Sequence, residues 1–301
     1  MTLTGSKSTK SNNPVAVAII PARFDSSRLP GKALLEIAGR PMISWVAEQA
    51  RAARNVTRVI VATDDTRIVT AVEAAGFEAV LTRTNHQSGT DRIAEVARDL
   101  DAEIIVNVQG DEPLISPETI DRAIEALIED DAESNSLDQT TGMVTTWEPI
   151  DRVADVLNPD VVKIVVDEAG RAVYFSRAPV PYPRDAIREH GTLSLALANY
   201  PGLLNGFRKH TGLYVYRIDV LLAFTSWPQS ALERSESLEQ LRALEHGVRI
   251  KAIEASTRSI GVDTPEDLER VREIVSRPEH LTSTKHRTPK TSNSRPALIQ
   301  T

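Results

Sequence analysis

Short apolar segments rich in β-branched residues alternate, in the first half of the chain, with segments whose apolar residues recur at helical spacing. We predict four strands here, at Val15 to Ile20, Arg58 to Ala62, Ala79 to Thr82 and Glu103 to Gln109. Each strand is followed by an amphipathic pattern with apolar residues three and four positions apart. This alternation predicts an α/β fold, in which helices flank a mostly parallel sheet.

The pattern changes after Met143, where the predicted strands lie closer together. Glu168, Ala169 and Gly170 are typical of a tight turn, so we expect a hairpin there. The elements predicted in this half are strands at Met143 to Trp147, Val161 to Val166, Ala172 to Ser176, His210 to Arg217 and Val248 to Ala255, and a helix at Leu238 to His246. The close spacing of the first three strands predicts a smaller β-rich lobe inserted into the fold.

The two ends of the chain differ in composition from the rest. Residues 1–13 are polar and without period, and residues 277–301 are rich in Ser, Thr, Pro and basic side chains. Such segments bury too little apolar surface to offset the entropy lost on ordering, so we predict a disordered tail at each end. Residues 14–276 are expected to fold as a single domain.

Composition argues against several classes of function. A net charge of −7 is unlike that of a protein with an extended nucleic-acid surface, and the absence of cysteine excludes disulfides and thiolate chemistry. No apolar run approaches the length of a membrane span, and the first residues lack the apolar core of a signal peptide. We therefore expect a soluble cytoplasmic protein that binds neither nucleic acid nor membrane.

An acidic pair follows the fourth predicted strand. The sequence EIIVNVQGDEP carries the chain through Gly110 into Asp111 and Glu112. Ligands of open parallel sheets bind beyond the carboxyl ends of the strands, so a carboxylate here is placed to hold a metal ion over a nucleotide. Gly-Asp is also common in ordinary turns, and this motif alone leaves both interpretations open.

A second acidic motif, GVDTPEDLERV, lies at another predicted strand-to-helix junction. Pro265 suits the first helical position, which makes Thr264 the N-cap and Asp267 its capping-box partner. Asp263 is left to project elsewhere, and if it converged on Asp111 the two carboxylates would form an all-oxygen site that suits Mg²⁺. The alternative is that Asp263 only interacts favourably with the helix dipole.

The loop after the first strand is basic. It reads PARFDSSRLPGK and carries Arg23, Arg28 and Lys32. Three cations at the carboxyl edge of a sheet suit a polyphosphate, because Arg offers forked donors, Lys a compact charge and glycine a close backbone approach. The loop matches neither a Walker A motif nor a dinucleotide fingerprint, which argues against an NAD-dependent oxidoreductase. On charge alone, a solvated basic loop is the alternative.

A third motif, NHQSGTDRIAEV, marks the start of a predicted helix. Ser88, Gly89 and Thr90 offer backbone and hydroxyl donors there, and Arg92 is placed to reach a base or a phosphate. The alternative is that Ser88 or Thr90 only caps the helix and that His86 is a surface residue.

Seven sequence strings, taken in order, resemble those of one family. They are PARxxSxRLPGK, TRTNHQSGTDR, NVQGDEP, YFSRAPVP, KHTGLYVYR, LEQLRALEHG and GVDTPEDLERV. Their order and spacing resemble 3-deoxy-manno-octulosonate cytidylyltransferase, the CMP-Kdo synthetase family of lipopolysaccharide synthesis, from about Val15 to Val275. Seven motifs in register are far more specific than any single motif.

The resemblance implies an enzyme and its reaction. Such nucleotidyltransferases transfer the CMP moiety of CTP to the anomeric hydroxyl of 3-deoxy-D-manno-octulosonate (Kdo), a 2-keto-3-deoxy sugar acid, and release pyrophosphate. The resemblance further implies Mg²⁺ as the cofactor and a homodimer as the working form. Residues 14–142 would form the Rossmann-like nucleotide-binding half, and residues 143–276 the half that binds the sugar and carries the dimerisation surface.

The resemblance also implies roles for individual residues. The catalytic residues would be Arg23, Lys32, Asp111 and Asp263, of which the two aspartates would bind the metal. The nucleotide would contact Arg23, Ser26, Arg28, Lys32, Ser88, Gly89, Arg92 and Gln109. The sugar acid would contact Arg177, His210, Tyr214, Glu239 and Gln240. Without the resemblance, Tyr214 would be interpreted as core, Arg177 as an ion pair at a strand end, and Glu239 with Gln240 as a solvated helix face.

The chain departs from the family pattern in a few places. Ala33 stands where proline is usual, Thr211 replaces an apolar residue beside His210, and the stretch from Tyr182 to Lys209 is longer than usual. These differences leave open a related acceptor, such as 8-amino-Kdo or a sialic-acid-like nonulosonate. A non-catalytic nucleotide-binding module is a further alternative.

Overall fold

The computed structural model describes residues 14–25, 29–133 and 140–277, without the side chains of residues 131–133. Residues 1–13 and 278–301, which make up nearly all of the two predicted tails, lie outside the described residues. Ser26 and Arg28, two of the predicted nucleotide-binding residues, also lie outside them. In the described part, no helix is long and apolar enough to cross a membrane.

Strands and helices alternate along the first half of the chain, as predicted. The elements of this half are β1 (Ala16–Ala22), η1 (Lys32–Leu34), β2 (Glu36–Ile37), β3 (Arg40–Pro41), α1 (Met42–Ala52), β4 (Val56–Thr63), α2 (Thr66–Ala74), β5 (Glu78–Leu81), α3 (Gly89–Ala97), β6 (Ile104–Asn107) and α4 (Pro117–Glu133). The second half contains β7 (Met143–Pro149), α5 (Val153–Leu157), β8 (Lys163–Val166), β9 (Ala172–Ser176), α6 (Arg184–His190), α7 (Leu193–Asn199), η3 (Pro201–Gly206), β10 (Arg208–Arg217), α8 (Ile218–Phe224), α9 (Ala231–Glu236), α10 (Gln240–Glu245), β11 (Ile250–Glu254) and α11 (Pro265–Val275).

The central sheet is mostly parallel. Its strand order is β11-β7-β10-β6-β1-β4-β5. The strands β6, β1, β4 and β5 are parallel neighbours, and β11 is parallel to β7. Within the described residues, β10 is the only strand in this order that runs in the opposite direction to the others. It is antiparallel to both β6 and β7. The predicted α/β fold is confirmed, and a separate two-stranded antiparallel sheet joins β2 to β3.

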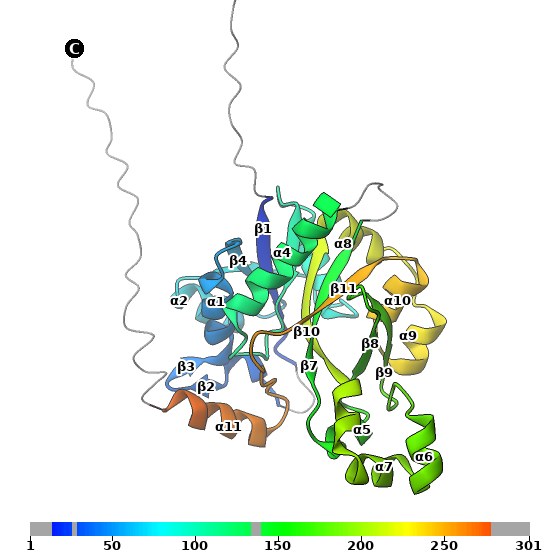
Figure 1. Ribbon diagram of the computed structural model, residues 1–301. Coiled ribbons are helices and arrows are strands. Elements are labelled where there is room, and N and C mark those ends of the chain that lie inside the picture. The colour runs from blue at the N-terminus through cyan, green and yellow to red at the C-terminus, as the bar shows by residue number, and fades with distance from the viewer. Residues whose placement is uncertain (1–13, 26–28, 134–139, 278–301) are drawn as a thin grey trace, which may run out of the picture.

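Helices cover both faces of this sheet (Figure 1). The packing of the β1 side chains shows why. Ala18 and Ile20 pack into a core shared with α1, α2 and α4, whereas Val17 and Ile19 pack into a second core shared with α3, α8 and α10. Successive side chains of a strand point to opposite faces, so a strand covered on both sides is apolar throughout. This accounts for the unbroken apolar run in β1.

The inserted lobe contains one hairpin and several short helices. The hairpin β8–β9 branches from β10 at the pair Lys209 and Lys163. Its turn is the predicted one, since the Gly170 N–H donates to the Asp167 carbonyl at 3.0 Å and Gly170 has a φ of +77°. The close spacing of the predicted strands placed β7 in the same lobe as this hairpin. In the structure, β7 instead pairs with β10 and β11 within the central sheet.

The helix α11 returns the end of the described chain to the first half of the fold. Figure 1 shows the segment after β11 crossing the molecule to place α11 beneath β2 and β3. Ile37, Met42, Val262, Leu268 and Val271 form a small core there. This packing brings the segment that precedes α11 to the carboxyl ends of β1 and β6.

The start of α11 has the predicted capping residues. The Thr264 side chain accepts from the Asp267 N–H, the Asp267 carboxylate accepts from the Thr264 N–H, and Pro265 occupies the first turn. The cap fixes where the helix begins, and therefore where Asp263 leaves it.

Candidate active site

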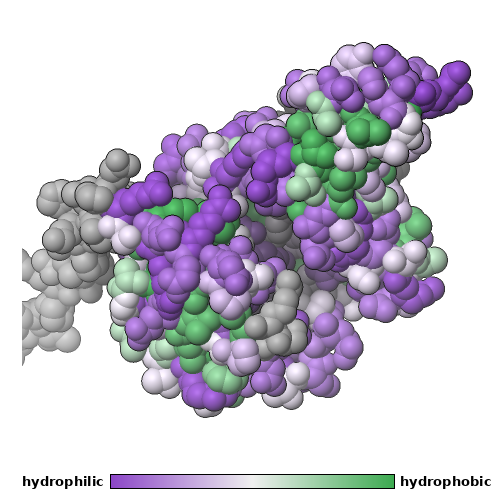
Figure 2. Space-filling model, turned by 90° about the horizontal axis from the view of Figure 1, so that it is seen from below, coloured by the Kyte–Doolittle hydropathy of each residue, from purple (hydrophilic) through white to green (hydrophobic). Residues whose placement is uncertain are grey.

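A cavity of about 710 Å³ lies beyond the carboxyl ends of β1 and β6. Figure 2 shows the surface hollowed here, with hydrophilic side chains around the opening. Its wall contains eight of the predicted site residues, namely Arg23, Lys32, Ser88, Gly89, Arg92, Gln109, Asp111 and Asp263. The wall also contains Pro21, Ala22, Asp25, Pro30, Ala33, His86 and Gly110. Segments far apart in the sequence therefore share one cavity, as the position of the motifs at strand ends implies.

The two aspartates singled out from the sequence converge on a single cation. The Lys32 ammonium nitrogen lies 2.6 Å from Asp111 Oδ2 and 3.1 Å from Asp263 Oδ1. The two carboxylate oxygens are therefore separated by no more than the sum of these distances. A backbone hydrogen bond holds the two segments together, because the Val262 N–H donates to the Asp111 carbonyl at 2.9 Å.

Lys32 keeps its charge between the two carboxylates. Burial disfavours the ammonium form, but the attraction of Asp111 and Asp263 outweighs it and raises the pKa of Lys32 above its ordinary value. Arg23 is another basic residue of the wall. It is exposed and forms no ion pair within the described residues. The cavity wall thus combines three carboxylates, those of Asp25, Asp111 and Asp263, with three cationic side chains, those of Arg23, Lys32 and Arg92.

Gly110 allows Asp111 to reach this position. A β-carbon on Gly110 would lie 2.7 Å from the backbone oxygen of Pro21, a contact that no side-chain movement relieves. Any other residue would push the exit of β6 away from the exit of β1. The glycine of the NVQGDEP motif is therefore required by the close approach of two strand ends.

Asp111 and Glu112, adjacent in sequence, have different environments. Asp111 faces the cavity, whereas Glu112 is buried beneath it, with its Oε1 only 3.4 Å from where a β-carbon on Gly212 would stand. Burial, reinforced by the negative charge of Asp111, raises the pKa of Glu112 to about 7. Asp111, the member of this acidic pair predicted to bind the metal, is the one that faces the cavity.

The segment that carries Asp263 is tied to the fold by side-chain hydrogen bonds. The Ser256 hydroxyl lies 2.7 Å from the Thr119 hydroxyl and 3.0 Å from the Ser116 hydroxyl, both near the start of α4. Further along, the Ser259 N–H donates to the buried Glu148 carboxylate at 2.8 Å. These bonds fix a long connection that regular secondary structure does not hold.

The start of α3 both caps the helix and lines the cavity. The Ser88 hydroxyl accepts from the Asp91 N–H at 3.1 Å, and the Asp91 carboxylate accepts from the Ser88 N–H at 3.2 Å. Capping by Ser88 is thus correct, and Ser88 and Gly89 also lie in the cavity wall. A helix start exposes N–H groups that suit an anion or another polar ligand.

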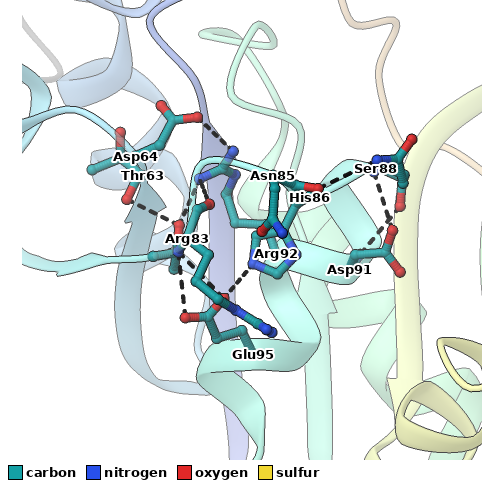
Figure 3. A network of polar contacts seen from close by, with 11 residues as sticks. Thr63, Asp64, Arg83, Asn85, His86, Ser88, Asp91, Arg92 and Glu95 are labelled. Atoms are coloured by element: carbon teal, nitrogen blue, oxygen red, sulfur yellow. Dashed lines mark hydrogen bonds and ion pairs between the residues drawn. The ribbon is translucent and has the colours of Figure 1, made fainter.

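Arg92 and His86 are held in a polar network beside the cavity (Figure 3). The Arg92 guanidinium donates to the Asp64 carboxylate at 2.7 Å and also bonds the Thr82 hydroxyl, so much of its donor capacity is used within the protein. The His86 ring bonds Glu95 and its side chain is only 7% exposed. The interpretation of His86 as a surface residue is therefore wrong, and no sequence signal identified it as part of the wall.

The five predicted sugar-binding residues do not line this cavity. Tyr214 is 4% exposed and its ring lies 5.4 Å from that of His210, so Tyr214 is part of the core, as its sequence pattern alone suggested. Gln240 is also buried, which rules out a solvated helix face there. The Arg177 guanidinium donates to backbone carbonyls, including that of Glu236 at 2.7 Å, rather than to a carboxylate.

Gln109 connects the cavity wall to the strand that carries His210 and Tyr214. Its side-chain amide donates to the Gly212 carbonyl at 3.0 Å. A β-carbon on Gly212 would lie 2.8 Å from Gln109 Cγ, so the glycine permits this close contact. The pairing of β10 with β7 shifts register at this point, between Thr211 and Tyr214. The predicted sugar residues of β10 therefore lie next to the cavity wall.

The converging aspartates fit a metal that takes part of its coordination from a ligand. Within the described residues, no three His, Cys, Asp or Glu side chains gather into a complete metal site. Two carboxylates alone are the usual protein contribution to Mg²⁺ bound with nucleotide phosphates, where water and phosphate oxygens supply the remaining positions. The position between them already accommodates a positive charge, that of Lys32.

Comparisons with known proteins identify the family of the chain. A family model described as cytidylyltransferase matches residues 17–250, which are more than half of the chain, so the chain is a cytidylyltransferase. A 3-deoxy-manno-octulosonate cytidylyltransferase of Geobacter sulfurreducens is 51% identical over 259 residues, which are 85% of this chain and 97% of that relative. One of Trichlorobacter lovleyi is 50% identical over 257 residues, with 85% and 97% covered. The chain belongs to the 3-deoxy-manno-octulosonate cytidylyltransferase family.

Solved structures show the same fold. A structure of CMP:2-keto-3-deoxy-manno-octonic acid synthetase complexed with CTP has a TM-score of 0.75 and 41% identity, covering 87% of this chain and 98% of that chain. A 4-diphosphocytidyl-2C-methyl-D-erythritol synthase from Anaerococcus prevotii has a TM-score of 0.53 at 14% identity, covering 88% and 97%. The second likeness concerns the fold alone.

His210 is expected to make the stability of the fold depend on pH. Burial, with the nearby positive charge of Lys209, lowers the pKa of His210 to about 3. An unfolded histidine titrates near 6.5, so the stabilisation is complete above pH 6.5 and is lost as the pH falls towards 3. At pH 5.5 the loss from this residue should be about 1.4 kcal/mol in the free energy of unfolding, measured by urea denaturation.

The variant His210→Gln should show a flatter dependence of unfolding free energy on pH between 7.5 and 5.5 than the unmodified protein. His246→Gln is the control, because it replaces a histidine at an exposed position. Equal slopes for the His210→Gln variant and the unmodified protein would contradict a half-buried His210 that stays neutral in the folded protein.

Proposed function

We propose that this protein transfers the CMP moiety of CTP to the anomeric hydroxyl of Kdo, giving CMP-Kdo and pyrophosphate for lipopolysaccharide synthesis. The observation that carries the proposal is the convergence of Asp111 and Asp263 on Lys32 in a cavity that also contains Arg23. This arrangement occurs in a chain that is half identical to relatives named for that reaction.

The cationic side chains of the cavity bind the triphosphate in this proposal. Attack on the α-phosphate requires alignment and charge neutralisation more than covalent help from the protein. Arg23 and Lys32 supply positive charge where negative charge spreads over the phosphates, and Arg28 and Ser26 belong to the same basic loop. Ser88 and Gly89 present the start of α3 to the nucleotide, Gln109 lines its pocket, and Arg92 supports the wall through its contact with Asp64.

Asp111 and Asp263 are the residues that would hold Mg²⁺. When bound, the ion would neutralise phosphate charge and orient the oxygens of the triphosphate. The carboxylates themselves are kept at the required separation by the backbone bond between Val262 and Asp111, and by the cap at Thr264. Without the ion, Lys32 balances their charge, which lowers the cost of holding two carboxylates so close together.

The sugar acid is bound next to the cavity, on the side of β10. His210 is neutral at physiological pH because burial lowers its pKa to about 3, so it contacts the sugar as a hydrogen-bonding group and not as a cation. Tyr214, Glu239 and Gln240 provide polar groups from β10 and the start of α10. Arg177 supplies positive charge near the sugar carboxylate. We assign no separate general base, because Mg²⁺ held by Asp111 and Asp263 would make the sugar hydroxyl more acidic and ease loss of its proton.

We propose further that the protein works as a homodimer through the inserted lobe. Tyr182, Leu195 and Tyr200 expose large side chains on this lobe, and such surface commonly pairs with another chain.

Light scattering should give twice the chain mass of 33.0 kDa. The variant Leu195→Asp should shift the mass towards the monomer, whereas Leu81→Asp, at the exposed edge strand β5, should leave it unchanged. A monomeric unmodified protein would contradict this proposal.

The proposed reaction is tested by pyrophosphate release from CTP with Mg²⁺ across a panel of sugar acids. Kdo should be the preferred acceptor, with 8-amino-Kdo and a sialic acid as competitors. Preference for one of the competitors would reassign the acceptor while leaving the reaction class in place. CTP binding without pyrophosphate release on any acceptor would mean that the protein is a non-catalytic nucleotide-binding module, and would overturn the proposal.

A further inference from the structure

The first turn of α3 has two sides with different surroundings. Ser88 and Gly89 line the cavity. Thr90, the next residue, is only 1% exposed, and its hydroxyl donates to Glu239 Oε1. Glu239 immediately precedes α10, so this single bond joins two helices that are far apart in the sequence. One helical turn therefore contacts both the nucleotide cavity and a predicted sugar-binding carboxylate.

Glu239 has little else to fix its orientation. Its second oxygen, Oε2, is buried without a hydrogen-bond partner in the described part of the chain. Burial raises the pKa of Glu239, and the hydroxyls of Thr90 and Ser88 counteract this by favouring the charged form. A buried carboxylate needs such donors, because an unpaired charge in the interior is costly. The Thr90 hydroxyl is the donor with a defined bond, so it sets where this carboxylate points.

Buried polar residues lie between Thr90 and the segment that carries Asp111. Tyr216 is buried beside Thr90 and Asn107, and the Asn107 side-chain oxygen accepts from the Gln109 amide at 3.4 Å. Gln109 lies in the cavity wall, two residues before Asp111. The Thr90 hydroxyl that bonds Glu239 is therefore connected, through Tyr216, Asn107 and Gln109, to the nucleotide side of the site.

We propose that Thr90 is a positioning residue that orients Glu239 for the sugar acid. This inference rests on the proposed function, because it takes Glu239 as a sugar contact.

The test compares Thr90→Val with Thr90→Ser in steady-state assays of pyrophosphate release. Valine keeps the shape of threonine but removes the donor, whereas serine keeps the donor. Thr90→Val should raise the KM for Kdo about tenfold, the order expected for losing one hydrogen bond to a charged group. Its KM for CTP, measured at saturating Kdo, should change less than about twofold, and Thr90→Ser should restore the KM for Kdo.

The control is Thr57→Val, which removes a hydroxyl bonded to the Ala16 carbonyl at 2.9 Å, at the opposite end of β4 from the site. It should leave both KM values unchanged. If Thr90→Val does not fold, Thr90→Ala has to show the same sugar-specific rise, because it also removes the hydroxyl that bonds Glu239.

Different outcomes separate the two proposals. An unmodified protein that uses no sugar acid would overturn the proposed function and this inference with it. If the protein is active on Kdo but the Thr90→Val variant has an unchanged KM for Kdo, only the role of Thr90 is overturned. The same holds if the KM values for Kdo and CTP rise equally. Failure of Thr90→Ser to restore the KM would do the same, since the effect would then depend on shape and not on the hydroxyl.

Discussion

Two carboxylates that repel one another are held together in this protein, and the rest of the site depends on how that is achieved. Lys32 bonds Asp111 and Asp263 at the same time and keeps its charge because their attraction outweighs its burial. The Val262 N–H fixes the separation by donating to the Asp111 carbonyl. The ammonium group therefore shows where positive charge is favoured, and a metal ion with a nucleotide's phosphates fits the same chemistry.

This constraint explains features of the fold that otherwise look unrelated. Gly110 has no side chain because the ends of β1 and β6 pass too closely for one. The helix α11 packs under β2 and β3, and its cap at Thr264 determines where Asp263 emerges. The start of α3 closes the cavity with Ser88 and Gly89, while Thr90 reaches Glu239. The sheet thus provides a rigid edge at which segments from the whole chain meet.

The sequence predicted the parts of this protein that follow from local patterns. Strand and helix periods predicted the parallel sheet, and Thr264, Pro265 and Asp267 predicted the helix start in detail. Local patterns failed where long-range packing decides, as for β7, which pairs with β10 and β11 and not with the nearby hairpin. The burial of His86 was missed for the same reason, since Glu95 reaches it only in the folded chain. The roles assigned to the sugar-binding residues stay predictions.

The most direct measurement is the rate of pyrophosphate release from CTP and Kdo as a function of Mg²⁺ concentration for Asp111→Asn and Asp263→Asn. Asp25→Asn is the control, because Asp25 lines the same cavity without joining the pair. The account predicts that each of the first two variants folds and keeps much of its CTP affinity but loses turnover about a hundredfold or more, as removal of a metal ligand does. Turnover and Mg²⁺ dependence in either variant equal to those of the unmodified protein would contradict it.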